Sequence, residues 1–309
     1  MKQILVVAGP TASGKTGLAV SLAKQYGGEV ISADSIQIYR DLNIASAKPT
    51  KEEMQGIPHH LIDFVSPFSG FSVADYAKKV WACIDDISAR GRLPIVAGGT
   101  GLYISSLVDN IEFAEESPDG AVRDRLWREK EEQGIESLYR RLESIDPEAA
   151  AKIHPHNEKR VIRALEIFET TGMTMTEQNR RSRRNLPPFD AFMLALSPPR
   201  EVLYERINRR VDTMVAEGLF EEAEKLQQKG ITRDLQCMQG IGYKEVFDYL
   251  DGLCTREACI ETIKQATRRY AKRQLTWLRR DARYHWLNPE DEGATKAVLE
   301  AFTWKNPSQ

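Results

Sequence analysis

Short apolar runs alternate with helix-patterned stretches in the first third of the chain. ILVVAG near the N-terminus and EVISAD after it are β-branched runs of strand length. Between them, apolar residues recur at helical spacing over 18–26, and Gly27 and Gly28 end the pattern. FSVADYAKKVWACIDDISARG predicts a second helix, which Ser72 and Asp75 would cap, and LPIVAGGTG is a further strand that runs into glycines. Strands that alternate with helices predict a parallel α/β sheet flanked by helices.

The pattern changes from about residue 115 to about residue 184. This stretch is rich in Glu, Arg, Leu and Ala and has no strand-like run, so a mostly helical insertion is predicted. FMLALSPPR then restores a strand, and the insertion therefore interrupts one α/β domain. We expect the catalytic core at residues 1–114 and 185–309, with the insertion domain at 115–184. After that last strand the chain is predicted to be helical up to a polar tail.

Composition adds little beyond the class of protein. Of the 309 residues, 41% are hydrophobic and 28% are charged, which is usual for a soluble globular enzyme. No apolar run reaches the ~20 residues of a membrane span, and the N-terminal run is too short for a signal peptide. The four cysteines form no CxxC pair, so neither a disulfide framework nor a zinc site is expected. A reducing, cytoplasmic location is the prediction.

Charge is distributed unevenly, although the net charge is only −2. EFAEESPDG is acidic, whereas NRRSRRN and TRRYAKRQLTWLRRDAR are basic. If the latter segment is helical, Lys272, Thr276, Arg279 and Arg283 share one stripe, and Trp277 with Leu278 faces the core. Nucleic-acid phosphates would bind such a stripe. The alternative is an ordinary solvated helix face.

A glycine-rich loop follows the first strand. Gly9, Gly14, Lys15 and Thr16 match G-x-x-x-x-G-K-[ST], with a strand before and a helix after the motif. The loop amides and the positive end of the helix attract phosphate, Lys15 adds a positive charge, and the Thr16 hydroxyl can hold Mg²⁺. The motif is typical of nucleotide-binding and above all ATP-binding proteins, but it says less about which phosphate compound is bound. The predicted phosphate loop comprises Gly9, Pro10, Thr11, Ala12, Ser13, Gly14, Lys15 and Thr16.

Asp34 is the carboxylate best placed to act beside this loop. It ends EVISAD, and the carboxyl ends of parallel strands line the ligand crevice. An ATP-driven motor would carry an acid at the end of an apolar strand, whereas LPIVAGG ends in glycines. Asp34 is therefore better placed to meet an acceptor substrate than a metal ion, although it could be a turn or helix-cap residue. For His59 and His60, packing or hydrogen bonding is expected, because no third ligand lies at metal spacing.

Seven motifs, in order and over most of the chain, give a specific resemblance. They are GPTASGKT, ISADSIQIYRDLNIASAKPT, HHLID, AGGTGLY, NEKRVIRALEIFETTG, QGIGYKE and KRQLTWLRRD. Together they resemble the bacterial tRNA dimethylallyltransferases, which transfer an isopentenyl group from dimethylallyl diphosphate to an adenosine next to the anticodon. The resemblance implies a P-loop kinase-like core, an insertion that grips the anticodon arm, Mg²⁺ as cofactor, and a monomeric enzyme. The zinc-finger tail of some eukaryotic relatives has no counterpart here.

The resemblance also implies roles for individual residues. The phosphate loop would hold the diphosphate, Arg210 would reach it from the far side, and Asp34 would be the general base. The implied catalytic residues are Asp34, Lys15, Thr16 and Arg210. The implied tRNA contacts are Asp34, Ser35, Ile36, Gln37, Thr100, Arg123, Lys159, Arg160, Val161, Ile162, Arg163, Lys272, Arg273 and Arg279. Some relatives carry a basic and a cysteine residue before GYK, where this chain has Gln239 and Gly240, so the implied contacts do not extend there.

Two other functions fit parts of the sequence. The first is a transferase that uses a free adenine nucleotide as acceptor; the long insertion and the basic C-terminal segment argue against it. The second is an NTP-dependent RNA-binding switch or motor, and the missing strand-end acid argues against that.

Overall fold

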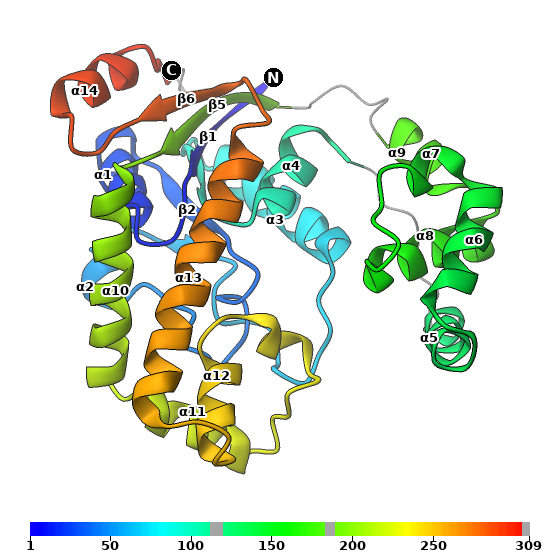
Figure 1. Cartoon of the computed structure of the whole chain (residues 1–309). Coiled ribbons are helices and arrows are strands. Elements are labelled where there is room, and N and C mark those ends of the chain that lie inside the picture. The colour runs from blue at the N-terminus through cyan, green and yellow to red at the C-terminus, as the bar shows by residue number, and fades with distance from the viewer. Residues whose placement is uncertain (112–119, 183–188, 305–309) are drawn as a thin grey trace. The chain divides into compact units, whose positions relative to one another are not determined.

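The chain divides into two compact units. The computed structural model describes residues 1–111, 120–182 and 189–304. The core comprises Met1–Val108 and Pro188–Gln309, and the insertion comprises Asp109–Pro187 (Figure 1). The predicted boundaries, between residues 114 and 115 and between 184 and 185, lie outside the described residues. So do residues 112–119 of the acidic segment and the end of the basic NRRSRRN segment.

The core is built on a parallel sheet of six strands in the order β3-β2-β4-β1-β5-β6. This confirms the predicted α/β class. The strands are β1 (Lys2–Ala8), β2 (Glu29–Ala33), β3 (His59–His60), β4 (Pro94–Gly98), β5 (Phe189–Leu196) and β6 (Tyr284–Leu287).

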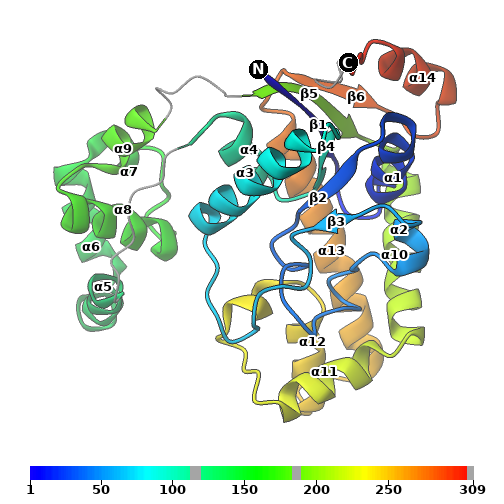
Figure 2. The same ribbon diagram turned by 180° about the vertical axis from the view of Figure 1, so that it is seen from behind.

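Helices cover both faces of this sheet (Figure 2). Successive side chains of a strand point to opposite faces, so Ile4 and Val6 belong to one apolar cluster and Leu5 and Val7 to another. The first cluster packs against α3, α4, α11 and α12, and the second against α1. The helices of the core are α1 (Lys15–Tyr26), α2 (Lys51–Met54), α3 (Val73–Ala89), α4 (Gly101–Val108), α10 (Arg200–Ala216), α11 (Leu219–Gln228), α12 (Tyr243–Leu250), α13 (Arg256–Leu278) and α14 (Glu292–Glu300).

Local signals set the ends of the N-terminal helices as predicted. Helix α1 ends at Gly27, whose positive φ of 64° is accessible to glycine without strain and lets its amide bond the Ala23 carbonyl. Helix α3 begins with the expected capping box, in which the side chains of Ser72 and Asp75 each accept the other's backbone amide.

The C-terminal part of the core differs from the all-helical prediction. Residues 284–287 form β6, which pairs in parallel with β5. Helix α13 ends at Leu278, so Arg283 is not on the helical stripe and instead pairs with Asp281 at 2.6 Å. Leu278 is buried as expected, but Trp277 is 37% exposed. The strand was missed because YHWL is short and follows a long basic helix, and only its position at an open sheet edge makes it a strand.

The insertion is helical throughout residues 121–181 apart from its turns. A separate apolar cluster, which includes Leu126, Leu138, Leu142 and Leu165, forms its core. Its helices are α5 (Ala121–Gln133), α6 (Ile135–Ile145), α7 (Pro147–Ala150), α8 (Glu158–Thr171) and α9 (Met175–Arg181). Among the described helices of the whole chain, none has the length and apolarity that a membrane span requires.

Candidate functional site

The phosphate loop joins β1 to α1 and leaves the helix N-terminus open. Gly14 precedes α1 with a φ of 91°, and no side chain caps the first turn. A Cβ at Gly9 would lie 2.6 Å from the Ser13 hydroxyl, so glycine is required where the loop folds back on itself. The Ser13 hydroxyl is buried and has no hydrogen-bond partner among the described residues. The uncapped amides of such a helix end can bind an anion.

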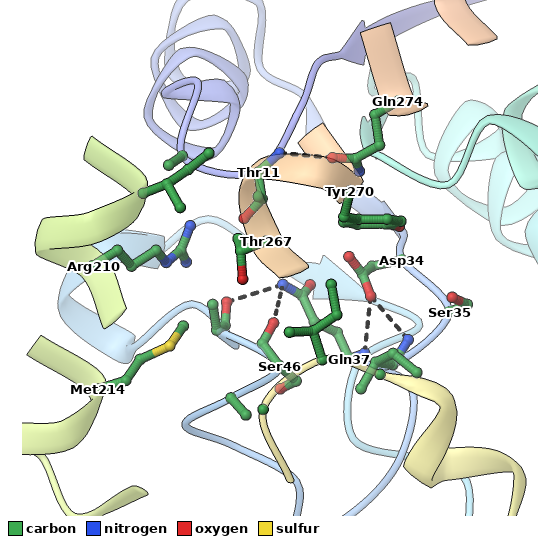
Figure 3. A pocket seen from close by; sticks show the side chains of 18 of the residues that line it. Thr11, Asp34, Ser35, Gln37, Ser46, Arg210, Met214, Thr267, Tyr270 and Gln274 are labelled. Carbon is green, nitrogen blue, oxygen red and sulfur yellow. Dashed lines mark hydrogen bonds between the residues drawn. The ribbon is translucent and has the colours of Figure 1, made fainter. Parts of the chain in front are cut away.

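Three strand ends meet at this edge of the sheet. Gly98 of β4 is in register with both Ala8 of β1 and Ala33 of β2. The residues that follow these strands therefore lie side by side, and they include the phosphate loop and Asp34. A cavity of about 320 Å³ opens here, between the strand ends and the helices α10 and α13 (Figure 3).

Among the described cations that line this cavity, Lys15 and Arg210 are the partly buried ones, and neither has a carboxylate partner, whereas Lys244 and Arg273 are exposed. Lys15 comes from the phosphate loop and Arg210 from α10, and both are partly buried. The Lys15 ammonium bonds the Pro10 carbonyl at 3.3 Å, and in the part of the chain that the structure describes neither cation forms an ion pair. Burial, reinforced by Arg210 and opposed by Asp34, lowers the pKa of Lys15 to about 8. Burial likewise lowers the pKa of Arg210. Uncompensated buried cations are unfavourable unless an anion binds them, so the cavity is suited to a phosphate group.

Asp34 both caps a turn and faces the cavity. Its Oδ1 accepts the backbone amides of Ile36 at 2.9 Å and of Gln37 at 3.2 Å. Figure 3 shows the carboxylate below Tyr270, with the second oxygen directed toward the side where Thr267 and Arg210 lie. The turn-cap interpretation is therefore confirmed, and the second oxygen is not used by the cap. That this oxygen meets an acceptor substrate stays a prediction.

The neighbours of Asp34 shape the same wall. The Gln37 amide donates to the carbonyls of Ser46 at 3.3 Å and Ala47 at 2.9 Å, and accepts from the Ser32 hydroxyl at 3.2 Å. Ser35 and Ile36 line the cavity, as do Gln239 and Gly240 from the opposite loop. Thr100 does not line it but accepts the Ser35 amide at 3.2 Å. Contacts of these residues with RNA stay predictions.

Helix α13 contributes residues that the motif reasoning missed. Thr267, Tyr270 and Gln274 line the cavity from this helix, and Met214 lines it from α10. Thr267, Tyr270 and Gln274 recur at intervals of three and four residues, which puts polar groups on one helical face, and that spacing is the signal that could have revealed them. Arg273 also reaches the cavity, with its guanidinium over the Tyr270 ring at 5.5 Å. Lys272 and Arg279 are exposed to solvent.

Comparisons with known proteins identify the family of this chain. The family model described as IPP transferase matches residues 37–281. The chain belongs to the IPP transferase family. The tRNA dimethylallyltransferase of Halalkalibacterium halodurans is 50% identical over 97% of this chain and 96% of its own length. That of Geobacillus kaustophilus is 49% identical over 98% and 95%.

Solved structures of family members have the same fold. The full-length tRNA isopentenylpyrophosphate transferase from Bacillus halodurans is 46% identical with a TM-score of 0.72, and the match covers 97% of this chain and 94% of that one. A eukaryotic dimethylallyltransferase acting on tRNA is 31% identical with a TM-score of 0.80, and the match covers 97% and 78%. The resemblance found in the sequence is therefore confirmed.

The insertion carries the remaining residues that the family resemblance assigned to tRNA. Lys159 and Arg160 are exposed in the first turn of α8. Arg123 and Arg163 both pair with Glu166, at 3.0 Å and 2.9 Å. The predicted contacts at Val161 and Ile162 need correction. Their side chains are 0% and 2% exposed in the core of the insertion and cannot reach RNA.

The groups present would suit Mg²⁺, the cofactor that the family resemblance implies. Thr16 lines the cavity and offers a hydroxyl oxygen, the kind of ligand that Mg²⁺ prefers. Within the described residues no group of three His, Cys, Asp or Glu side chains could hold a metal ion by itself. An Mg²⁺ ion here would thus take further ligands from a bound phosphate.

The two histidines His59 and His60 lie outside the cavity. The His60 ring bonds Glu29 at 2.7 Å, and the His59 ring bonds the Ile57 carbonyl at 2.8 Å.

Proposed function

We propose that the protein transfers a dimethylallyl group from dimethylallyl diphosphate to the exocyclic amine of the adenosine 3′-adjacent to the anticodon of tRNA, at position 37, and releases diphosphate. Relatives named tRNA dimethylallyltransferase support it. The observation that carries the proposal is that Asp34 faces two uncompensated cations, Lys15 and Arg210, across one cavity. A base on one side and an anion site on the other suit a transfer reaction whose leaving group is diphosphate.

The cationic side would stabilise the leaving group. Cleavage of the allylic C–O bond leaves negative charge on diphosphate and positive charge on carbon. Lys15, Arg210 and the amides of the phosphate loop offset the negative charge in a partly desolvated site. Mg²⁺ bound through Thr16 would supply further positive charge at the diphosphate oxygens.

The acidic side would activate the acceptor. The exocyclic amine of adenine is a poor nucleophile because its lone pair is delocalised into the ring. As the N–C bond forms and the C–O bond breaks, the amine loses a proton, which the free oxygen of Asp34 would accept. General-base assistance of this kind contributes roughly 10²–10⁴-fold. The adenine must leave the base stack to reach the cavity, so we expect base flipping.

Two alternative functions are weaker. A free adenine nucleotide as acceptor would make no use of the exposed cations Lys272 and Arg279 on α13 or Lys159 and Arg160 on α8. A nucleotide-driven motor would need a strand-end acid, and β4 runs into Gly98 and Gly99 instead.

We propose further that the enzyme acts as a cytoplasmic monomer. The free thiols of Cys83, Cys237, Cys254 and Cys259 suit a reducing compartment.

The decisive experiment compares acceptors. Labelled dimethylallyl diphosphate is incubated with an anticodon stem-loop that has an unpaired adenosine 3′ of the anticodon, with the same loop closed into a duplex, and with AMP. A parallel reaction with ATP alone measures hydrolysis. The stem-loop should be prenylated, because its adenosine is already unpaired and flips at the lowest cost. Equal kcat/KM for AMP, equal reaction of the duplex, or ATP turnover without transfer would each refute the proposal.

A further inference from the structure

Gln274 bonds two loops of the active site at once. It lies on α13 and is only 6% exposed. Its side-chain oxygen accepts the backbone amide of Thr11 at 3.0 Å, and its side-chain nitrogen donates to the Gly99 carbonyl at 2.9 Å. Figure 3 shows the bond to Thr11 at the top of the cavity. Thr11 belongs to the phosphate loop and Gly99 to the turn after β4. Since both ends of the side-chain amide are occupied, Gln274 is not free to act on substrate.

Gly99 and Gly101, after β4, allow the close approach of α13 to this turn. A Cβ at Gly99 would lie 2.1 Å from the Gln274 nitrogen. A Cβ at Gly101 would lie 2.1 Å from the Trp277 ring. Both residues of α13 can approach the turn only because these positions lack side chains. Gly99 and Gly101 are thus the positions at which this turn packs against α13.

The same turn is bonded to the segment that carries the base. The Thr100 amide donates to the Ala33 carbonyl at 3.2 Å, and the Thr100 hydroxyl accepts the Ser35 amide at 3.2 Å. Asp34 lies between these two residues. A series of hydrogen bonds therefore runs from Thr11 through Gln274 to Gly99, and from the adjacent Thr100 to Ala33 and Ser35, the residues on either side of Asp34. The phosphate side and the base side of the cavity are held in register by this series.

We propose that Gln274 is a positioning residue, which fixes the phosphate loop relative to Asp34 and thereby aligns the leaving group with the acceptor amine. The inference rests on the proposed function. Transfer requires the reacting atoms to be aligned, and a misplacement of about 1 Å can lower the rate about 10²-fold. Loss of the amide also leaves a buried donor and a buried acceptor unsatisfied, which loosens both loops.

The test variant is Gln274→Met, which keeps the side-chain length and removes both hydrogen bonds. We expect kcat for the stem-loop to fall roughly 10–100-fold, while the dissociation constant of the stem-loop changes less than about threefold because no RNA-facing charge is lost. Inorganic diphosphate, titrated by calorimetry, should bind about fivefold to tenfold more weakly, which is the loss that one hydrogen bond allows.

The matched control is Gln236→Met. Gln236 makes the same kind of double contact, accepting the Phe71 amide at 3.0 Å and donating to the Phe71 carbonyl at 2.8 Å, but it does not line the cavity. This variant should lose thermal stability while kcat and diphosphate affinity stay within about twofold, since neither Gln236 nor its partner Phe71 lines the cavity. An equal loss of kcat in the two variants would reduce Gln274 to a structural role and overturn the inference.

Gly99→Ala provides a second route to the same result. The new methyl group would lie 2.1 Å from the Gln274 nitrogen and displace that flexible end, and it would lie 3.1 Å from the Gly9 carbonyl, a tight but smaller conflict. The variant therefore tests the proposal even if Gln274→Met does not fold. Combined with Gln274→Met, this substitution should lower kcat little further, because both changes break the same contact.

Wild-type transfer tests the proposed function separately. If wild type transfers nothing, the diphosphate titration alone decides on Gln274, and unchanged affinity in both variants would refute its role.

Discussion

At the scale of single residues, the cavity holds positive charges that destabilise the ligand-free protein and would bind an anionic ligand. Burial lowers the pKa of Lys15, with Arg210 adding to the effect, and burial also lowers the pKa of Arg210. Asp34 opposes it but forms no ion pair with either within the described residues. A bound diphosphate would satisfy both cations. Stability and function are therefore in conflict at these positions, as is usual in active sites.

Lys15→Met should stabilise the ligand-free protein while abolishing diphosphate binding. The folded-state pKa of Lys15 is about 8 against an ordinary 10.5, so the unfolded chain binds more protons between these values. The free energy of unfolding of wild type therefore rises with pH from about 8 to 10.5, and the charged lysine destabilises the protein in full below pH 8. We expect the variant to gain on the order of 1 kcal/mol at pH 7 in urea unfolding and to show a flatter rise above pH 8.

Lys24→Met is the control for this prediction. Lys24 lies on the same helix, is exposed, and bonds only Gln55 at 2.7 Å. Its replacement should leave both the pH profile and diphosphate affinity unchanged. A Lys15→Met variant that is less stable than wild type at pH 7 would contradict the prediction that the charge of Lys15 destabilises the folded protein.

Asp34→Asn should retain both substrates and lose turnover. The amide oxygen can still accept the amides of Ile36 and Gln37, so the turn persists. The base is lost, and the single-turnover rate at saturating substrates should fall about 10²–10⁴-fold. A rate within about threefold of wild type would leave Asp34 with only its turn-capping role, since that is well below the usual contribution of a general base.

At the scale of elements, helix α13 has three faces, which meet the apolar core, the cavity and solvent. Ala271 and Leu278 are buried, Tyr270 and Gln274 line the cavity, and Lys272 faces solvent. The helix packs against α10 through Ala271, Leu203 and Ile207 (Figure 1). An RNA bound on the solvent face would lie within one helical turn of the residue that bonds the phosphate loop.

Lys272→Ala combined with Arg279→Ala should weaken tRNA binding and flatten its salt dependence. Each phosphate contact contributes about 0.7–0.9 to the slope of log K against log salt, so the slope magnitude should fall by about 1.4–1.8. Arg273 is left intact, because it also lines the cavity. Arg256→Ala is the control, since this exposed arginine lies at the other end of α13 with its guanidinium over Phe220. If the slope does not change in the double variant, this face is merely solvated.

At the scale of the whole molecule, two units with separate cores predict more than one unfolding transition. The insertion has its own apolar cluster, and Trp127 is the one tryptophan in the sequence of residues 109–187. Inorganic diphosphate at 100 times its dissociation constant should stabilise the core by about 2.7 kcal/mol. Thermal unfolding followed by calorimetry should show the core transition move upward. The unfolding transition that Trp127 fluorescence reports, obtained by subtracting the signal of Trp127→Phe, should keep its midpoint temperature. A single transition that moves as a whole would show that the units unfold together.

The sequence by itself determined whatever depends on neighbours along the chain. The phosphate loop, the capping box at Ser72 and the helix end at Gly27 are local, because backbone conformation and short-range hydrogen bonds set them. The alternation of strands and helices determined the parallel sheet for the same reason. Asp34 could be placed at the site because all parallel strands end at one edge.

Only the tertiary structure decided which distant segments meet. YHWL became β6 because an open edge of β5 was beside it, and the side chains of Val161 and Ile162 are buried because the insertion packs around them. Gln274 bonds loops that are 263 and 175 residues away, so helical spacing could mark it as a cavity residue but could not reveal these two bonds. Burial and long-range hydrogen bonds depend on how elements pack, and a single sequence carries no direct record of those distances.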